Sequence, residues 1–197
     1  MKTEIEAKFL DIDPAATREK LGALGAVLVY PETLVRQKVF DFPDFRLDKD
    51  LSWLRLRDEN GSIVLTLKQW REEGVHGMKE IETKAGSFEE AERLLKAIGM
   101  IVKSDQEKKR ELWRLDNVEF MIDTWPWIPT FMEIEGDSEN EVRAMTTRLD
   151  FKWDNAYFGG VSRIYKQYFN IEYAQIDRCP EIVFSSVPEW LEKTRIA

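Results

Sequence analysis

The sequence is poor in residues that build several common kinds of site. It contains one cysteine, Cys179, and one histidine, His76, among 197 residues. A single cysteine allows no internal disulfide and no cysteine-rich metal site, which suits a reducing cytosol, and we interpret Cys179 as structural. A histidine metal site needs further ligands, so we interpret His76, in the loop bounded by Gly74 and Gly77, as a solvated loop residue.

Long apolar runs and an excess of basic residues are also missing. No segment approaches the roughly 18 uncharged apolar residues that a membrane-spanning helix needs. Glu4, Glu6 and Lys8 interrupt any signal-peptide core, so we expect a cytoplasmic protein without a membrane partner. The net charge of −8 argues against a nucleic acid partner, because such a surface is basic overall. A local cluster of cations can still bind a small polyanion.

The hydrophobic content of 43% supports a real core, and the length fits one domain with or without a tail. Helix starts are predicted at Asp13-Pro14, Ser87 and Ser138, where capping residues precede apolar stripes. Strands are predicted at residues 3–10, 34–42, 52–58, 62–69, 78–84, 103–115, 118–124 and 130–136. This order, with several hairpins, indicates a mainly antiparallel α+β protein.

Charged residues alternate with apolar ones in strand after strand. Glu4, Glu6 and Lys8 share one face of the first predicted strand, and Arg55 and Arg57 share one face of another. Such a sheet is either half exposed and laced with salt bridges, or closed into a barrel around a polar lumen. Alternation alone leaves the two arrangements equally open.

The charged motifs together resemble the CYTH superfamily, also called triphosphate tunnel metalloenzymes. That group includes class IV adenylyl cyclases, thiamine triphosphatases and inorganic tripolyphosphatases. The resemblance covers roughly residues 2–150, and residues 153–165 are similar to the tail of relatives in the cyclase branch. The matching motifs are, in order, Glu4-x-Glu6-x-Lys8, Leu54-Arg55-Leu56-Arg57, Leu65-Thr66-Leu67-Lys68, Glu80-Ile81-Glu82, Lys108-Lys109-Arg110, Asp123, and Phe131-Met132-Glu133-Ile134-Glu135.

The resemblance implies an eight-stranded antiparallel β-barrel, the triphosphate tunnel, with helices packed outside. We expect residues 1–170 to form this domain and residues 171–197 to form a C-terminal tail that packs on the barrel. The Tyr and Phe content of the C-terminal region favours docking or dimer contacts, so a homodimer is left open.

Functional residues are carried over from the resemblance motif by motif. The phosphate-binding cations would be Lys8, Arg55, Arg57, Lys68, Lys108 and Arg110. The acids that would hold Mg²⁺ or Mn²⁺ are Glu4, Glu6, Asp123, Glu133 and Glu135. The residues expected to take part in catalysis are Glu4, Glu6, Lys8, Glu80 and Glu82, the last two by orienting the cations or the attacking water.

One stretch departs from the family pattern. Many relatives carry Gln-x-Asp-x-Tyr-Phe in the second strand, whereas this chain reads Val35-Arg36-Gln37-Lys38-Val39-Phe40-Asp41. Arg36 and Lys38 share a face and are expected to add cations at the tunnel mouth. The loop at residues 69–77 either closes over substrate or is a mobile hairpin tip.

The expected function is metal-dependent hydrolysis of a triphosphate-containing small molecule. Candidate substrates are inorganic tripolyphosphate and triphosphate esters such as thiamine triphosphate or a nucleotide. The alternative is a class IV adenylyl cyclase that converts ATP to cyclic AMP and pyrophosphate, in which the ribose 3′-hydroxyl is the nucleophile. A polyphosphate-binding module without turnover is the third hypothesis, and the intact set of acids makes it the weakest.

Overall fold

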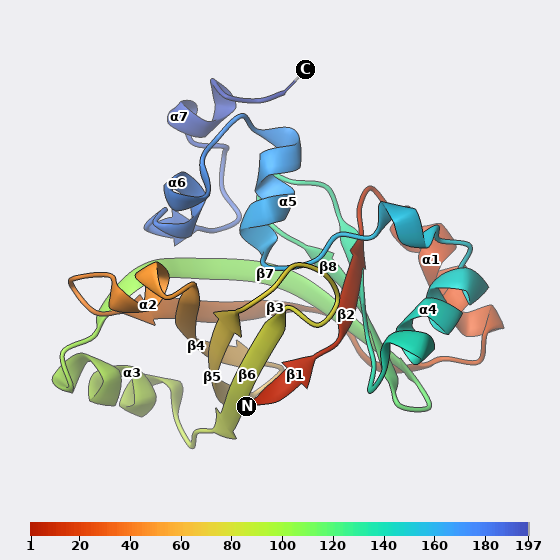
Figure 1. Ribbon diagram of the computed structural model, residues 1–197, viewed down its shortest axis with the longest axis horizontal. Coiled ribbons are helices and arrows are strands. Elements are labelled where there is room, and N and C mark those ends of the chain that lie inside the picture. The colour runs from red at the N-terminus through yellow and green to blue at the C-terminus, as the bar shows by residue number, and fades with distance from the viewer. Residues whose placement is uncertain (197) are drawn as a thin grey trace.

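The strands of this computed structural model, which describes residues 1–196, belong to one strongly curved sheet (Figure 1). They are β1 (Lys2–Glu4), β2 (Glu6–Phe9), β3 (Val27–Asp41), β4 (Ser52–Glu59), β5 (Ser62–Trp70), β6 (Met78–Lys84), β7 (Ile101–Leu115), β8 (Val118–Thr124), β9 (Phe131–Glu135) and β10 (Glu181–Ile182). The helices are α1 (Pro14–Ala23), α2 (Arg46–Lys49), α3 (Phe88–Ala97), α4 (Glu139–Arg148), the 3-10 turn η1 (Trp153–Asn155), α5 (Val161–Tyr168), α6 (Tyr173–Asp177) and α7 (Glu189–Glu192).

The sheet closes because the N-terminal segment pairs with both of its ends. Strand order is β1-β6-β5-β4-β3-β7-β8-β9-β2, and every neighbouring pair on this path is antiparallel. β1 and β2 are one stretch of chain interrupted only at Ile5, and the seven strands β3–β9 complete the ring. The predicted eight-stranded antiparallel barrel is therefore confirmed, in a nearly closed form.

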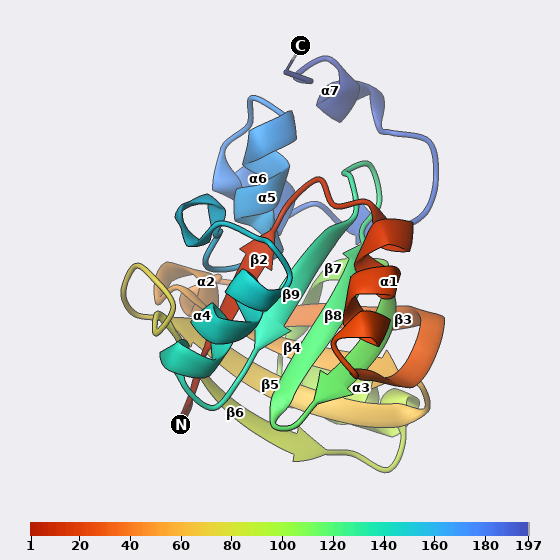
Figure 2. The same cartoon turned by 90° about the vertical axis from the view of Figure 1, so that its right-hand side faces the viewer.

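Helices cover the apolar outer face of the barrel. α1 and α4 pack on β8 and β9 (Figure 2), where Leu21 and Val142 join Phe120 and Ile134 in a buried cluster. On the opposite side α3 covers β3 and β4 through a second apolar cluster. Since alternate residues of a strand point to opposite faces, burial of the apolar face outside the barrel turns the charged face into the lumen.

The local signals for the helices are also confirmed. Ser87 accepts a hydrogen bond from the backbone N–H of Glu90 at 3.2 Å, and Ser138 accepts one from Glu141 at 3.3 Å. Asp13 caps α1 in the same way. Caps of this kind each stabilise a helix by about 1 kcal/mol. None of the helices within residues 1–196 is long and apolar enough to cross a membrane.

Strand β3 is longer than predicted, because it begins at Val27 rather than at residue 34. It pairs with β7 along its whole length, with register shifts around Pro31. β4 pairs with β3 only from Arg36 onwards, so the proline, which lacks an N–H donor, lies where the other edge of the strand carries no partner. Pairing with the long strand β7 therefore extends β3 over Pro31, although proline disfavours strands.

The C-terminal region packs against one end of the barrel. Phe131 of β9 and Tyr165 of α5 share an apolar cluster with Ile176 and Leu191 from the last segments of the chain. β10 also pairs with β7, in parallel. Because residues on both sides of position 170 share this cluster, the division into a domain and a tail stays a prediction. Ala197, the last residue of the expected tail, lies outside the described residues.

Candidate active site

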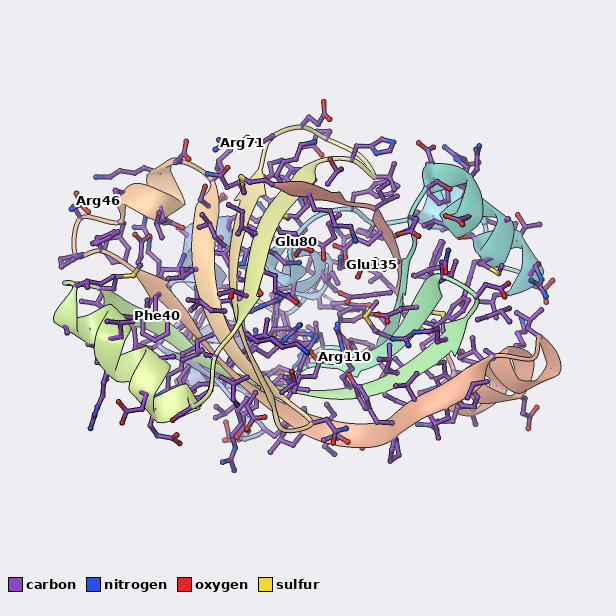
Figure 3. All side chains as sticks on the ribbon, turned by 90° about the horizontal axis from the view of Figure 1, so that it is seen from below. Phe40, Arg46, Arg71, Glu80, Arg110 and Glu135 are labelled. Atoms are coloured by element: carbon purple, nitrogen blue, oxygen red, sulfur yellow. The ribbon has the colours of Figure 1, made fainter. Side chains whose placement is uncertain are left out.

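The barrel encloses a cavity of about 670 Å³ whose walls are strongly charged. Viewed along the barrel, Glu80, Arg110 and Glu135 point into the lumen, while Phe40 points outwards to α3 (Figure 3). The structure brings together twelve of the thirteen residues selected from the sequence. Those on the cavity wall are Glu4, Glu6, Lys8, Arg55, Arg57, Lys68, Glu80, Glu82, Lys108, Arg110, Glu133 and Glu135.

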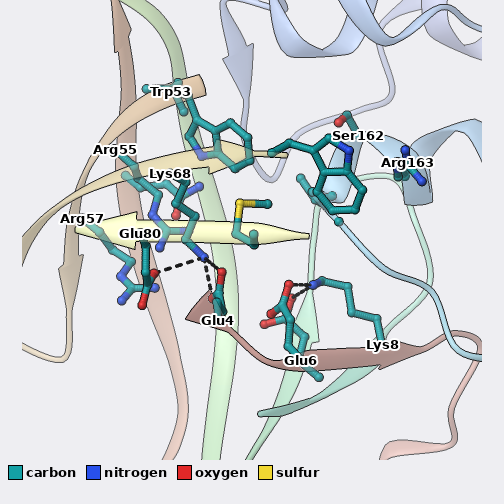
Figure 4. A pocket seen from close by; sticks show the side chains of 18 of the residues that line it. Glu4, Glu6, Lys8, Trp53, Arg55, Arg57, Lys68, Glu80, Ser162 and Arg163 are labelled. Carbon is teal, nitrogen blue, oxygen red and sulfur yellow. Dashed lines mark hydrogen bonds and ion pairs between the residues drawn. The ribbon is translucent and has the colours of Figure 1, made fainter. Parts of the chain in front are cut away.

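Two lysines compensate acids of the N-terminal segment (Figure 4). Lys68 Nζ donates to both carboxylate oxygens of Glu4 at 2.6 Å and lies 3.7 Å from Glu80. Lys8 donates to Glu6 and lies 3.5 Å from Glu133. Burial acts against the charge of Lys8, but the neighbouring acids Glu6 and Glu133 raise its pKa above the usual range. Both lysines are therefore turned towards carboxylates of the cavity.

Asp123 is the one predicted residue that lies behind the cavity wall. It is fully buried and accepts hydrogen bonds from Lys108 Nζ at 2.8 Å and from Arg110 Nε at 2.6 Å. Arg110 also donates to Glu133. Asp123 thus orients the side chains of Lys108 and Arg110 from behind the cavity wall. The metal-binding role assigned to Asp123 stays a prediction.

Positive charge is in excess around Arg55. Burial, with the nearby guanidinium groups of Arg57 and Arg110, lowers the pKa of Arg55 to about 10. Within residues 1–196 the buried Nε of Arg55 has no hydrogen-bond acceptor, whereas Arg57 Nε lies 2.8 Å from Glu59 Oε2. Burial, followed by the charge of Arg110, likewise lowers the pKa of Lys108 to about 8. An unpaired buried donor is costly, so this part of the wall is suited to an anion.

Negative charge is in excess around Glu135 and Glu6. Burial, followed by the charges of Glu4 and Glu6, raises the pKa of Glu135 to about 8, and no ion pair involves Glu135 within residues 1–196. Burial raises the pKa of Glu6 to about 7, against the effect of Lys8 and with support from Glu4 and Glu133. These crowded carboxylates are suited to a cation.

The donor set fits a hard divalent cation by its chemistry, since carboxylate oxygens are the ligands that Mg²⁺ and Mn²⁺ prefer. In the described part of the chain, however, no three His, Cys, Asp or Glu side chains are gathered closely enough to hold a metal ion. The reason is visible in the ion pairs: Glu4 and Glu6 are each bound to a lysine. The excess of negative charge around Glu135 is what a cation would compensate.

Several residues of the cavity wall were missed by the sequence analysis. Glu59 has the same parity as Arg55 and Arg57 on β4, a signal that was available. Trp53, Trp70 and the segment from Gly159 to Arg163 line one end of the cavity, and only the tertiary structure brings these distant segments together.

The expectation for Arg36 and Lys38 was wrong. Gln37 lines the cavity, and its neighbours therefore face away from it. Arg36 is exposed, and Lys38 pairs with Glu92 of α3 at 2.9 Å on the outside of the barrel. The segment at residues 69–77 reaches the cavity through Trp70 and Glu73.

The two scarce residues lie outside the cavity. His76 is half exposed, and its Nε2 lies 3.1 Å from Glu139. Cys179 is buried among apolar residues of the C-terminal region, and burial raises the pKa of its thiol. Neither is arranged as a reactive or metal-binding group.

Solved structures share this architecture. A candidate adenylate cyclase from Vibrio parahaemolyticus aligns with a TM-score of 0.71 at 15% identity, covering 84% of this chain and 98% of its own. A protein from Pyrococcus horikoshii OT3 aligns with a TM-score of 0.66 at 23% identity, covering 78% and 94%. A Hippeastrum protein, described as a candidate adenylyl cyclase with a dominant triphosphatase activity, aligns with a TM-score of 0.55 at 18% identity, covering 82% and 93%.

Identities this low show a shared fold and nothing finer. No curated protein matches the sequence. The family model of the CYTH domain matches residues 2–152, which include every strand of the barrel and every charged motif. The chain therefore belongs to the CYTH family.

Proposed function

We propose that this protein is a metal-dependent hydrolase of a triphosphate substrate bound in the charged tunnel. The observation that carries the proposal is the separation of charge within one cavity. Within residues 1–196 Arg55 has no ion-pair partner and its buried Nε no hydrogen-bond acceptor, while Glu135 and Glu6 are crowded by other carboxylates. A triphosphate with its metal ion supplies the missing anion and the missing cation together.

The phosphate chain would lie against the cations of the tunnel. Arg55, Arg57 and Arg110 offer planar forks that bind two oxygens at once. Lys108 and Lys68 act as point charges on flexible stems. Asp123 holds Lys108 and Arg110 in place before substrate arrives, so less side-chain entropy is lost on binding.

The metal would be Mg²⁺ or Mn²⁺, held by Glu4, Glu6 and Glu135, with Glu133 and Asp123 as the further predicted ligands. When bound, such an ion neutralises charge on the phosphate oxygens and activates a nucleophile. Burial disfavours the charge of both Glu4 and Glu6; Lys68 nevertheless lowers the pKa of Glu4, whereas Lys8 only partly offsets the rise in the pKa of Glu6. Both lysines would bind phosphate oxygens in the complex. We further propose that Glu80, 3.7 Å from Lys68, and Glu82, which accepts a hydrogen bond from Thr66 at 3.2 Å, orient cations or the attacking water.

A second candidate is the adenylyl cyclase reaction on ATP. It is favoured by the aromatic end of the cavity, where Trp53, Trp70 and Tyr173 offer surfaces for an organic group. Cyclisation also requires the ribose 3′-hydroxyl to be aligned on the α-phosphate, which an aromatic surface alone does not accomplish. The hydrolase requires only the charged groups described above, and the Hippeastrum neighbour is described as mainly a triphosphatase.

Product analysis tests the proposal. The purified protein is incubated with tripolyphosphate, thiamine triphosphate and ATP, each with Mg²⁺ or Mn²⁺, and the products are resolved by chromatography. Orthophosphate release without cyclic AMP supports the hydrolase. Cyclic AMP with pyrophosphate would establish the cyclase instead, and binding without turnover would leave a binding module.

A further inference from the structure

The lumen-facing residues of β4 follow an ordered series from one end of the cavity to the other. Trp53, Arg55, Arg57 and Glu59 alternate with residues on the outer face, and all four line the cavity. Trp53 lies beside Gly160 at the start of α5, whereas Glu59 is the last residue of the strand, next to the turn into β5. Successive members of the series are about 7 Å apart along the strand. One wall of the tunnel thus changes from aromatic to cationic to anionic.

Glu59 occupies the position that a further anion would take. Its Oε2 lies 2.8 Å from Arg57 Nε, and its Oε1 lies 3.8 Å from Arg110 Nη1. Tyr30 donates its hydroxyl hydrogen to the same carboxylate, which fixes the orientation of the side chain. Glu59 therefore meets two of the proposed phosphate-binding arginines at the end of their row.

The carboxylate of Glu59 is ionised at neutral pH. Burial opposes ionisation, but Arg110 and Arg57 outweigh it and hold the pKa of Glu59 at about 2. The side chain is 14% exposed, so bulk water screens its charge poorly. A phosphate that approached this point would meet a fixed negative charge in place of a free guanidinium.

Charge alone would make a cationic tunnel prefer the longest polyphosphate, because each added phosphate brings more negative charge. The series on β4 contains two cationic positions before the carboxylate, a span comparable to a chain of three phosphates. The tunnel therefore has a defined end for its phosphate-binding surface.

We propose that Glu59 is a specificity-determining residue that limits the bound phosphate chain to three phosphates. This inference rests on the proposed function and deepens it, because it names the chain length that the same site accepts. Glu59 does not touch the reacting atoms in this proposal. It excludes a fourth phosphate by placing its carboxylate against Arg57 Nε and near Arg110 Nη1.

The test compares binding of inorganic tripolyphosphate and tetrapolyphosphate by calorimetry, in EDTA so that metal chelation by the ligands does not enter. The variants are Glu59→Gln, which keeps the shape and removes the charge, and Asp58→Asn as a matched control. Asp58 is the neighbouring residue on the outer face of β4, where it accepts a hydrogen bond from Gly61 N at 3.1 Å. Circular dichroism checks that each variant is folded.

The parent protein is expected to bind tripolyphosphate at least as tightly as tetrapolyphosphate. Glu59→Gln is expected to shift the ratio of the two dissociation constants towards tetrapolyphosphate by about tenfold, while Asp58→Asn leaves it unchanged. An unchanged ratio in a folded Glu59→Gln variant would overturn the inference and leave the proposed function standing. A parent protein that strongly prefers tetrapolyphosphate would overturn it even if the variant failed to fold. A parent protein that binds neither ligand in EDTA would overturn the inference, and the proposed function fails as well only if tripolyphosphate is also not hydrolysed with Mg²⁺ or Mn²⁺.

Discussion

Replacing Arg55 by glutamine is expected to stabilise the ligand-free protein and to abolish its response to tripolyphosphate. Arg55 is a cation in a cavity where Arg57 and Arg110 repel it and where, among the residues that the structure describes, its Nε has no acceptor. A guanidinium kept for binding rather than for folding should behave in this way, because functional sites retain groups that cost stability.

The magnitude follows from the pKa of Arg55, which falls from its ordinary 12.5 to about 10. At about 1.4 kcal/mol for each pH unit, this corresponds to at most roughly 3–4 kcal/mol against the charged form. Water in the cavity screens part of this cost, so a gain of about 1–2 kcal/mol is expected from the substitution. For a chain of this size the gain raises the melting temperature by roughly 3–6 °C.

Ligand binding should reverse the order of the melting temperatures of the parent protein and the Arg55→Gln variant. Tripolyphosphate at a concentration of about 100 times its dissociation constant stabilises the parent by about 2.7 kcal/mol, and the variant lacks this contribution. Differential scanning fluorimetry with and without tripolyphosphate, in EDTA, measures both effects. Arg55→Gln should therefore melt above the parent without ligand and below it with saturating ligand.

Arg18→Gln provides the contrasting control. Arg18 of α1 pairs with the buried carboxylate of Glu111 at 3.0 Å on the outside of the barrel. Its loss should lower the melting temperature and leave the ligand response intact. If Arg55→Gln behaves like Arg18→Gln, Arg55 is a structural ion-pair partner and the reasoning about excess positive charge is refuted.

Three further outcomes are expected. Glu6→Gln should abolish metal-dependent turnover while circular dichroism and melting remain those of a folded protein; unchanged turnover would remove Glu6 from the proposed metal site. Because the pKa of Lys108 is lowered to about 8, its charge is present below that pH and lost above it, so tripolyphosphate affinity in EDTA should fall between pH 7 and 9. Lys108→Arg should retain the affinity at pH 9, and an identical fall in that variant would assign the titration elsewhere. Arg163 pairs with Glu73 at 2.6 Å and stacks on a tryptophan, so Arg163→Ala should speed hydrogen exchange in residues 71–77 several-fold; equal exchange rates would show that this pair does not hold the loop.

Some of the site was readable from local sequence. In Trp53-Leu54-Arg55-Leu56-Arg57, alternation specifies that the arginines share a face, because the side-chain period of a strand is two. Ser87 and Ser138 also predicted helix starts correctly. The hydrogen bonds that these capping residues form are to residues three positions on, so local sequence suffices to predict them.

Alternation along a strand predicts which residues face the cavity only when one inward-facing residue of that strand is correctly identified. Arg36 and Lys38 were assigned to the tunnel by their charge, yet Gln37 occupies the inward position. One residue of register moves a whole set of side chains to the other face. Glu59 continues the inward series of β4 but falls outside the recognised motif, so its place in the cavity was overlooked.

The sequence by itself determined the strand and helix order, the partition of charged and apolar residues into faces, and the family resemblance. Which face is internal was decided only by the tertiary structure, because β1 and β2 must pair with β6 and β9 for the sheet to close. The excess charges at Arg55 and Glu135 likewise exist only after closure, since they arise from groups on strands far apart in the chain that line one cavity. Local sequence patterns specify which face of a strand each side chain points to. Electrostatic interactions depend on the distances between charged groups, and only the folded chain sets these distances.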